Sequence, residues 1–295
     1  MTSQPSPVPS DGGRTRRRGY SLAAAAVLLF STSPVLIRAA DTISSLEIAW
    51  WRLFLASLTV LVVAAFSRHT VRWRPLASRR FALYGLTIAL HFFCYIASLS
   101  FTTVAHSLAL VYTAPVFIAV LSRAVLKEGL TPSRWAGVAL GVIGAAILAG
   151  VEPDIRPRAL LGDALAIGSA LAFAVYSVAG RSVRERYPLY DYAGGVYGWG
   201  AIWLAPLALW AAPGSVYHLP ALGAVAFLGI GPLGIGHTLY NAALRRAPAT
   251  AVNLIATGEV FGGVLLGALF LAEYPTPVAL TGGAIVLLGI GLVIR

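Results

Sequence analysis

The chain has 295 residues, of which 58% are hydrophobic and only 11% are charged, and its formal net charge is +11. A soluble domain carries roughly 25% charged residues, because its surface must remain in contact with water. This composition excludes an ordinary soluble protein, and the single cysteine, Cys94, excludes a disulfide framework and a cysteine metal cluster. The basic residues lie between apolar runs and form no continuous face, so the positive charge does not predict nucleic-acid binding.

The N-terminal segment, residues 1–18, is rich in Pro, Ser, Gly and Arg, and we expect it to be a disordered cytoplasmic tail. Arg14 and Arg16–Arg18 precede an apolar stretch, which is also the pattern of a signal peptide. That alternative is the weaker one, because no soluble mature domain follows.

Ten apolar segments follow the tail, and each has close to the 20 or so residues that a helix needs to cross a bilayer. The connections between them are too short to hold a soluble catalytic unit. We therefore predict an all-α integral membrane protein with ten transmembrane helices. The expected spans are 20–38, 46–66, 81–101, 104–126, 134–151, 159–180, 190–211, 220–244, 249–271 and 275–294.

The basic residues predict the orientation of these spans. If the N-terminus is inside, the cytoplasmic segments hold 18 of the 22 Lys and Arg residues. Only Arg38, Arg156 and Arg158 then lie outside, and Arg52 lies within the second span. Cytoplasmic loops of membrane proteins are enriched in Lys and Arg, so both termini are expected in the cytoplasm.

The two halves of the chain resemble each other, which predicts two repeats over residues 19–151 and 159–295. An offset of 145 residues relates Tyr95–Leu148 to Tyr240–Val293 without a gap. Because each repeat has five spans, the second copy enters the membrane upside down. Inverted repeats of this kind build secondary transporters with a substrate site near the bilayer midplane. The matching positions are Glu128 and Glu273, Thr131-Pro132 and Thr276-Pro277, Gly137 and Gly282, and Gly144 and Gly289; at an offset of 143, Phe30 matches Phe173 and Arg38 matches Arg181.

These motifs resemble the EamA domain of the drug/metabolite transporter superfamily, present here as two tandem copies. The resemblance lies in Pro115 of the fourth span, and in Tyr95-x-Ala97 and the run from Glu128 to Gly144, which both have counterparts in the second copy. It implies an exporter of the plasma (inner) membrane, with spans one to four and six to nine around a cavity and spans five and ten at the periphery. Members of the family often have Glu-Pro-Val in the ninth span, whereas this chain has Glu259-Val260, so no proline kink is predicted there.

Ionisable and polar residues inside the spans are the candidate substrate-binding or coupling groups, because such residues are costly in a membrane. Glu259 lies near the middle of the ninth span and is either a proton carrier or a hydrogen-bonded brace between helices. Arg52 either extends its side chain to the interface or attracts an anionic or zwitterionic substrate. Two polar stripes at helical spacing are expected to face the interior: His91, Tyr95 and Ser98 in the third span, and His237, Tyr240 and Asn241 in the eighth.

Each histidine is either a proton-coupling group or a side chain capped by a neighbouring Ser, Tyr or carbonyl. The mid-membrane aromatics Tyr112, Tyr176 and Trp199 are expected either to line the cavity or to pack in the core. Pro34 and Pro115 interrupt the first and fourth spans and predict kinks where backbone carbonyls become available.

The sequence contains no Walker A motif, no nucleophile elbow and no pair of histidines at metal-binding spacing, so we expect neither an enzyme nor a cofactor. The leading hypothesis is a gradient-driven transporter that exports a small metabolite such as an amino acid by alternating access. The expected partners are this metabolite, the lipid bilayer and, for the coupling, protons. A membrane-embedded enzyme acting on lipid-linked substrates and a passive channel are the alternatives.

Overall fold

The computed structural model describes residues 12–99, 101, 104–150, 156–272 and 274–294, and every regular element in these ranges is helical. The elements are α1 Gly12–Phe30, α2 Ser33–Ala39, α3 Ser45–Phe66, α4 Trp73–Leu76, α5 Arg79–Leu99, α6 Val104–Val111, α7 Ala114–Leu121, the π-helix η1 Ser122–Leu126, α8 Pro132–Ala149, α9 Pro157–Ser182, α10 Leu189–Ala211, the 3-10 turn η2 Ala212–Gly214, α11 Leu219–Leu228, the π-helix η3 Gly229–His237, α12 Thr238–Leu244, α13 Ala249–Ala256, α14 Gly258–Leu271 and α15 Pro277–Ile294.

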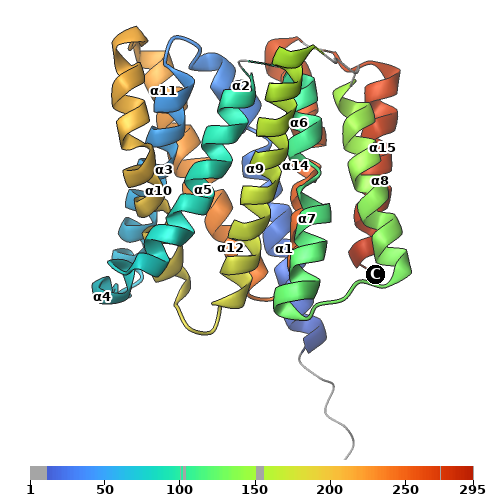
Figure 1. The fold of residues 1–295 in the computed structure, drawn as a ribbon, viewed down its shortest axis with the longest axis horizontal. Helices are drawn as coiled ribbons and strands as arrows, with labels where there is room; N and C mark the ends of the chain where they lie inside the picture. The colour runs from blue at the N-terminus through green and yellow to red at the C-terminus, as the bar shows by residue number, and fades with distance from the viewer. Residues whose placement is uncertain (1–11, 100, 102–103, 151–155, 273, 295) are drawn as a thin grey trace, which may run out of the picture.

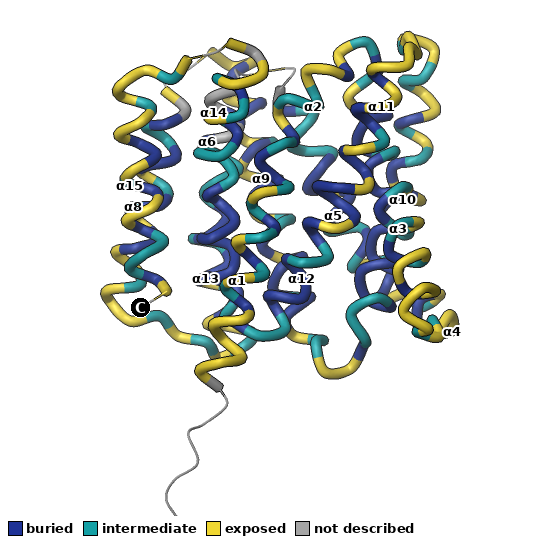
Figure 2. Tube along the Cα trace, turned by 180° about the vertical axis from the view of Figure 1, so that it is seen from behind, coloured by how far each residue is buried: buried dark blue, intermediate teal, exposed yellow. Residues whose placement is uncertain are grey.

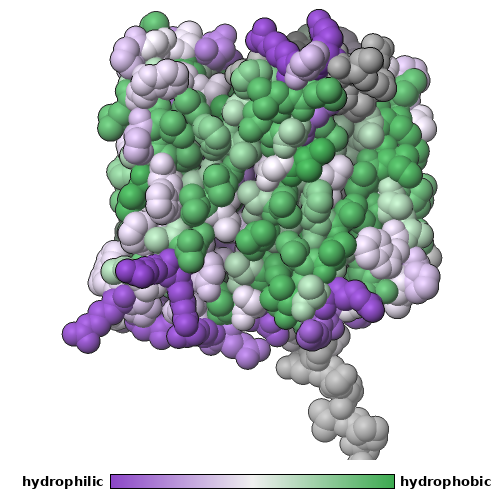
Figure 3. Space-filling model, viewed as in Figure 1, coloured by the Kyte–Doolittle hydropathy of each residue, from purple (hydrophilic) through white to green (hydrophobic). Residues whose placement is uncertain are grey.

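The helices stand side by side (Figure 1), and on the face drawn in Figure 3 a mostly apolar band lies between two more hydrophilic ends. Within the described ranges, nine helices are long and apolar enough to cross a membrane, and Pro132–Leu148 is a shorter apolar helix. This shorter helix belongs to α8, which occupies the expected fifth span. The loops at the lower end in Figure 1 carry many arginines, and we call this end, with residues 67–78, 127–131, 183–188 and 245–248, the arginine-rich end.

The helical part of the N-terminus is longer than the sequence predicts. The expectation of disorder up to residue 18 is wrong for its last residues, because α1 already begins at Gly12. Arginine is a good helix former, so its high helix propensity is compatible with an extension of the first span through Arg14 to Arg18. The rest of the expected tail, like Glu273 of the repeat motif, lies outside the described residues.

The core lies between α3, α5, α9, α10 and α12, where buried segments of several helices meet (Figure 2). Small residues permit this contact: a Cβ atom on Gly200 of α10 would lie 3.0 Å from a methyl group of Ile88 and 3.2 Å from one of Leu53. Small side chains let membrane helices approach closely, and packing then stabilises their association. The core therefore joins helices from both halves of the chain.

The helices α8 and α15 form a pair at one side of the bundle (Figure 1). A Cβ atom on Gly137 would lie 2.7 Å from the carbonyl oxygen of Gly289, and one on Gly144 would lie 2.8 Å from that of Gly282. Real Cβ atoms do not approach backbone atoms so closely, so only glycine fits at these positions. We call this contact of Gly137, Gly144, Gly282 and Gly289 the glycine seam.

Replacing Gly282 by valine is expected to destabilise the protein by about 1–3 kcal/mol, the usual cost of forcing extra methyl groups into a packed contact. The new Cβ atom would overlap the backbone nitrogen of Leu148. Thermal unfolding of the purified protein in detergent measures the loss. Gly291→Val in the same helix is the matched control, because a Cβ atom at Gly291 would have no neighbouring atom within 4 Å. Equal melting temperatures of the two variants would contradict this account of the seam.

Candidate functional site

Four membrane-spanning segments lose regular α-helical geometry within their length, two in each half of the chain. The interruptions are residues 31–32 between α1 and α2, residues 112–113 between α6 and α7, the π-helix η3, and Thr257 between α13 and α14. Pro34 and Pro115 directly follow the first two, as expected for a residue that lacks an N–H group. The break at Thr257 has no proline beside it.

The interruptions from the two halves contact one another. The Phe30 ring at the end of α1 lies 4.7 Å from the His237 ring at the end of η3. The Tyr112 hydroxyl, in the break between α6 and α7, donates a hydrogen bond of 2.7 Å to Oε1 of Glu259, just after the break at Thr257. Interrupted helices occur at membrane depth only where protein or a cavity satisfies their backbone. The centre of the bundle is therefore the candidate site.

Arg52 and Glu259 bring opposite charges to this centre from α3 and α14. The Arg52 side chain is buried, its guanidinium carbon lies 4.9 Å from the centre of the Phe92 ring, and its Nε has no hydrogen-bond partner. The two residues are close enough to interact electrostatically, but they are not among the ion pairs within 4.0 Å in the described ranges. A buried cation without a direct partner is costly, so this arrangement can bind an anion.

His237 lies in an aromatic cluster that includes Phe92, the ring that contacts Arg52. The ring of Phe92 from α5 lies 6.2 Å away and that of Phe173 from α9 lies 6.1 Å away. His237 is buried, and its Nδ1 has no hydrogen-bond partner. A polar nitrogen without a partner among aromatic rings remains available for a ligand or a proton.

His91 has a different environment, because its hydrogen bonds join α5 to α9. Its Nδ1 lies 2.9 Å from Oγ of Ser169 and 3.2 Å from the carbonyl oxygen of the same residue. The Ser169 hydroxyl in turn donates to the backbone oxygen of His91 over 3.0 Å. Because the Ser169 hydroxyl has only one hydrogen and donates it to this backbone oxygen, it must accept the hydrogen bond from Nδ1 of His91. Nδ1 is therefore assigned as the ring nitrogen that carries the hydrogen. This is the capped arrangement that the sequence left open as one of two interpretations.

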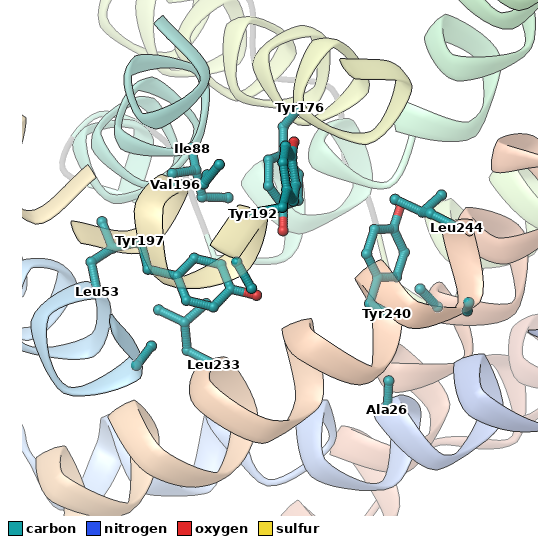
Figure 4. Packing of buried hydrophobic residues seen from close by; sticks show 14 of the residues in the cluster. Ala26, Leu53, Ile88, Tyr176, Tyr192, Val196, Tyr197, Leu233, Tyr240 and Leu244 are labelled. Atoms are coloured by element: carbon teal, nitrogen blue, oxygen red, sulfur yellow. The ribbon is translucent and has the colours of Figure 1, made fainter. Parts of the chain in front are cut away.

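A layer of polar side chains lies between this cluster and the arginine-rich end, because Tyr240 and Asn241 follow His237 along the helix that leads to residues 245–248. Figure 4 shows Tyr176, Tyr197 and Tyr240 of this layer. Nδ2 of Asn241 donates to the hydroxyls of Tyr176 at 2.7 Å and Tyr197 at 3.0 Å. The Tyr240 hydroxyl lies 2.8 Å from Oγ of Ser177. All five side chains are buried, so the layer closes the bundle between the centre and the arginine-rich end. The polar stripe on the eighth span indicated Tyr240 and Asn241, but no sequence pattern marked Tyr197 or Ser177.

Three further candidate residues lie at different distances from the centre. Tyr95 is half-buried and lies near Arg52 and Glu259. Ser98 contacts Ser107 at 2.5 Å and so joins α5 to the next helix, α6. The indole Nε1 of Trp199 donates to the carbonyl oxygen of Leu76 at 2.7 Å, which directs this side chain to α4 and away from the central cluster.

An ion pair closes the arginine-rich end between the two halves. The guanidinium group of Arg181 in α9 lies 2.6 Å from Oε1 of Glu128, and its Nη1 donates to the carbonyl oxygen of Leu244 over 2.7 Å. The other carboxylate oxygen of Glu128 accepts from the backbone N–H of Ala249 at 3.4 Å. One carboxylate and one guanidinium thus join the segment before α8 to α9, α12 and α13.

A second carboxylate joins helices at the opposite end. Glu47 in the first turn of α3 accepts hydrogen bonds from Ser215 and, at 2.6 Å, from the hydroxyl of Tyr217. The carboxylate stabilises the protonated phenol and thereby raises the pKa of Tyr217. The Thr42 hydroxyl adds a hydrogen bond of 2.8 Å to the carbonyl oxygen of Val216. The loop before α11 is therefore fixed to the start of α3.

Comparison with known proteins identifies the family. The family described as "EamA-like transporter family" matches residues 17–150 and again residues 160–295. The chain belongs to this family. Its EamA-like segments cover both halves of the apolar bundle, so the protein is a multi-pass membrane protein of a transporter family.

Relatives of this EamA-like protein are named transporters. An uncharacterized transporter of Archaeoglobus fulgidus is 26% identical over 86% of this chain and 90% of its own length. The threonine/homoserine exporter RhtA of Escherichia coli K12 is 24% identical over 80% of this chain and 78% of its own. A "Probable terminal-alkyne amino-acid exporter" of Streptantibioticus cattleyicolor is 28% identical over 63% of this chain and 62% of its own. A solved crystal structure matches the fold with a TM-score of 0.81 at 21% identity, covering 93% of this chain and 95% of that one.

A double-mutant cycle measures the ion pair at the arginine-rich end. We expect Glu128→Gln and Arg181→Gln to show a coupling free energy of at least about 1.5 kcal/mol in thermal or denaturant unfolding, because both groups are largely buried and share charged hydrogen bonds. Arg184 and Glu185 form the matched control pair, since the Glu185 side chain is 88% exposed and such pairs contribute roughly 0–1 kcal/mol. Equal coupling in the two cycles would exclude a special role for the Arg181–Glu128 pair.

Proposed function

We propose that this protein is a secondary transporter that exports a small zwitterionic metabolite, such as an amino acid, by alternating access. The observation that carries the proposal is the pair of opposite charges, Arg52 and Glu259, held at the centre of the bundle without a direct ion pair. Two relatives are named as exporters of amino acids. The sequence has no ATP-binding motif, so an ion or substrate gradient is the proposed source of energy.

The proposed halves are two five-helix repeats in opposite orientation, with the shorter helix α8 counted as the fifth of ten spans. The glycine seam supports this arrangement. Gly137 and Gly144 of the first copy correspond in sequence to Gly282 and Gly289 of the second. In the seam Gly137 contacts Gly289 and Gly144 contacts Gly282, so each glycine meets the counterpart of the other. Two copies related by a two-fold axis exchange contacts in this way. With five spans in each copy, that axis lies in the plane of the membrane.

The proposed orientation has the arginine-rich end in the cytoplasm, with both termini inside and the protein in the inner membrane. The excess of Lys and Arg in the loops at this end supports the assignment. In this orientation the Arg181–Glu128 pair and the tyrosine layer close the cytoplasmic side, and the Glu47 contacts lie on the outer side. Alternating access would then require the Arg181–Glu128 pair to open when the site faces the cytoplasm.

The proposed substrate places a carboxylate on Arg52 and an ammonium group toward Glu259. The Nε–H group of Arg52 has no hydrogen-bond partner and can donate a hydrogen bond to a carboxylate. The oxygens of Glu259 and of the Tyr95 hydroxyl can accept hydrogen bonds from an ammonium group. Phe30, Phe92 and Phe173 can pack against an apolar side chain. Recognition of both charged ends distinguishes an amino acid from a simple amine or a simple acid.

The proposed coupling group is Glu259, with His237 of the central aromatic cluster as a second proton acceptor. A carboxylate that receives a proton loses its charge and its attraction for an ammonium group. Proton entry from outside would therefore release the substrate outward, and proton loss to the cytoplasm would restore the site. His91 is assigned a supporting role in this scheme, because its Nδ1 already bonds Ser169.

Uptake of labelled amino acids into proteoliposomes containing the purified chain tests the substrate assignment. We expect Arg52→Gln to weaken binding of amino acids at least tenfold, while the corresponding amines without a carboxylate lose little. Tenfold corresponds to about 1.4 kcal/mol, which is within the range of a charged hydrogen bond. Arg184→Gln, a change outside the central cluster, serves as the control. Equal losses for amino acids and amines would contradict a carboxylate contact with Arg52.

An imposed pH gradient tests the coupling. The unaltered protein is expected to accumulate substrate on the acidic side, because protons leaving that side exchange for substrate entering it. Glu259→Gln should still exchange labelled for unlabelled substrate but should no longer respond to the gradient. If flux in the unaltered protein ignores the pH gradient, proton coupling is wrong. If Glu259→Gln responds like the unaltered protein at every pH, Glu259 is only a brace for Tyr112.

A further inference from the structure

A cavity of about 670 Å³ lies at the arginine-rich end, where α4, the start of α5 and the segment after α9 meet. Its lining includes Arg72, Ser78, Arg79, Arg80, Arg186 and Tyr187. In Figure 3 the hydrophilic side chains at the lower left, over the position of α4 and α5 in Figure 1, directly border the apolar face. None of these residues belongs to the central cluster, so the cavity needs its own explanation.

The cavity has more positive charge than its surroundings neutralise. Nε of Arg72 lies 2.8 Å from the buried carboxylate of Asp191, which His69 also contacts at 2.7 Å. Arg79, Arg80 and Arg186 have no such acidic partner among the ion pairs within 4.0 Å in the described ranges. Three guanidinium groups around one cavity repel each other unless an anion lies between them, and guanidinium groups match the geometry of phosphate.

Two further features of the cavity are the Ser78 hydroxyl, which has no hydrogen-bond partner, and Arg186, which lies against an aromatic ring. Oγ of Ser78 is buried and has no hydrogen-bond partner. The Arg186 guanidinium carbon lies 5.5 Å from the centre of the Tyr187 ring, which restricts its position. A buried hydroxyl without a partner costs free energy that a bound acceptor oxygen would recover. A hydroxyl and several arginines together are the donors that a phosphate group needs.

The neighbouring surface is apolar and continues from the cavity along one face of α5. Arg79 lies one helical turn before Leu83, which is 60% exposed, and the same face continues to the exposed Leu90. Trp73 in α4 is 63% exposed at the same end. Exposed tryptophan is typical of the membrane–water interface. This apolar face favours a ligand that has hydrocarbon chains as well as a phosphate, rather than free phosphate.

We propose that this cavity binds the headgroup phosphate of an anionic phospholipid from the leaflet at the arginine-rich end. The phosphate lies between Arg79, Arg80 and Arg186 and accepts a hydrogen bond from Ser78. The acyl chains lie against the exposed face of α5 at Leu83 and Leu90. Basic pockets between transmembrane helices are known to bind such headgroups. The lipid would join α4, α5 and the segment before α10, next to the contact of Arg72 with Asp191.

Native mass spectrometry and thermal unfolding of the full chain test this site with phosphatidylglycerol, phosphatidylcholine and inorganic phosphate. We expect preferential retention of phosphatidylglycerol and a higher melting temperature with it than with phosphatidylcholine. Removing one basic side chain near an anionic lipid weakens binding on the order of fivefold. The triple variant R79Q/R80Q/R186Q should therefore lose the preference, and Ser78→Ala, which changes no charge, should reduce it.

The matched control is R14Q/R16Q/R17Q, which removes three exposed arginines at the same end from α1. This control should keep the preference for phosphatidylglycerol, and the melting temperature in phosphatidylcholine should be the same for both triple variants. Equal losses in the two triple variants would show a general attraction of the basic surface and overturn the site. Stabilisation by inorganic phosphate equal to that by the lipid would assign the cavity to free phosphate and also overturn the proposal.

Discussion

In the hydrocarbon of a membrane, every backbone N–H and carbonyl group must find a hydrogen-bond partner inside the protein. This requirement explains why the regular elements in the described ranges are helices and why their interruptions matter. The breaks after Phe30, at Tyr112 and at Thr257 face other helices, and side chains such as Tyr112 and Glu259 meet there. The polar groups of the candidate site are thus concentrated at the depth where regular helical geometry is lost.

The sequence predicted the membrane-spanning helices well, because their apolar length is a property of each segment alone. It also indicated the breaks before Pro34 and Pro115, since proline removes a backbone donor at a known position. The break at Thr257 has no comparable local signal and depends on packing against other helices. The π-helix η3 does contain a proline, Pro232, and its glycines allow close packing, as in the approach of Gly236 to the Phe30 ring. The helical start at Gly12 was missed because composition alone suggested disorder.

The candidate site could be predicted only as a set of residues on helix faces. Helical spacing placed His91 and His237 in the interior, but it could not separate their environments. His91 bonds Ser169, whereas His237 lies among aromatic rings with a free nitrogen, and this difference depends on which helices are neighbours. For the same reason, neither the hydrogen bond of Tyr112 to Glu259 nor that of Trp199 to Leu76 could be predicted from the sequence. Pairings across distant segments follow from the rotation and tilt of helices.

The glycine seam has a mechanical consequence for the whole bundle. Backbone lies directly against backbone at Gly137 and Gly289 and at Gly144 and Gly282, with no side chain between them that could change its rotamer. Such a contact resists sliding, because any shift would bring the atoms of one helix into those of the other. In the alternating access proposed above, the pair of helices α8 and α15 would therefore serve as the hinge between the two halves. A rotation about this pair would move the opposite edge of the bundle, near α3 and α10, through the largest arc (Figure 1).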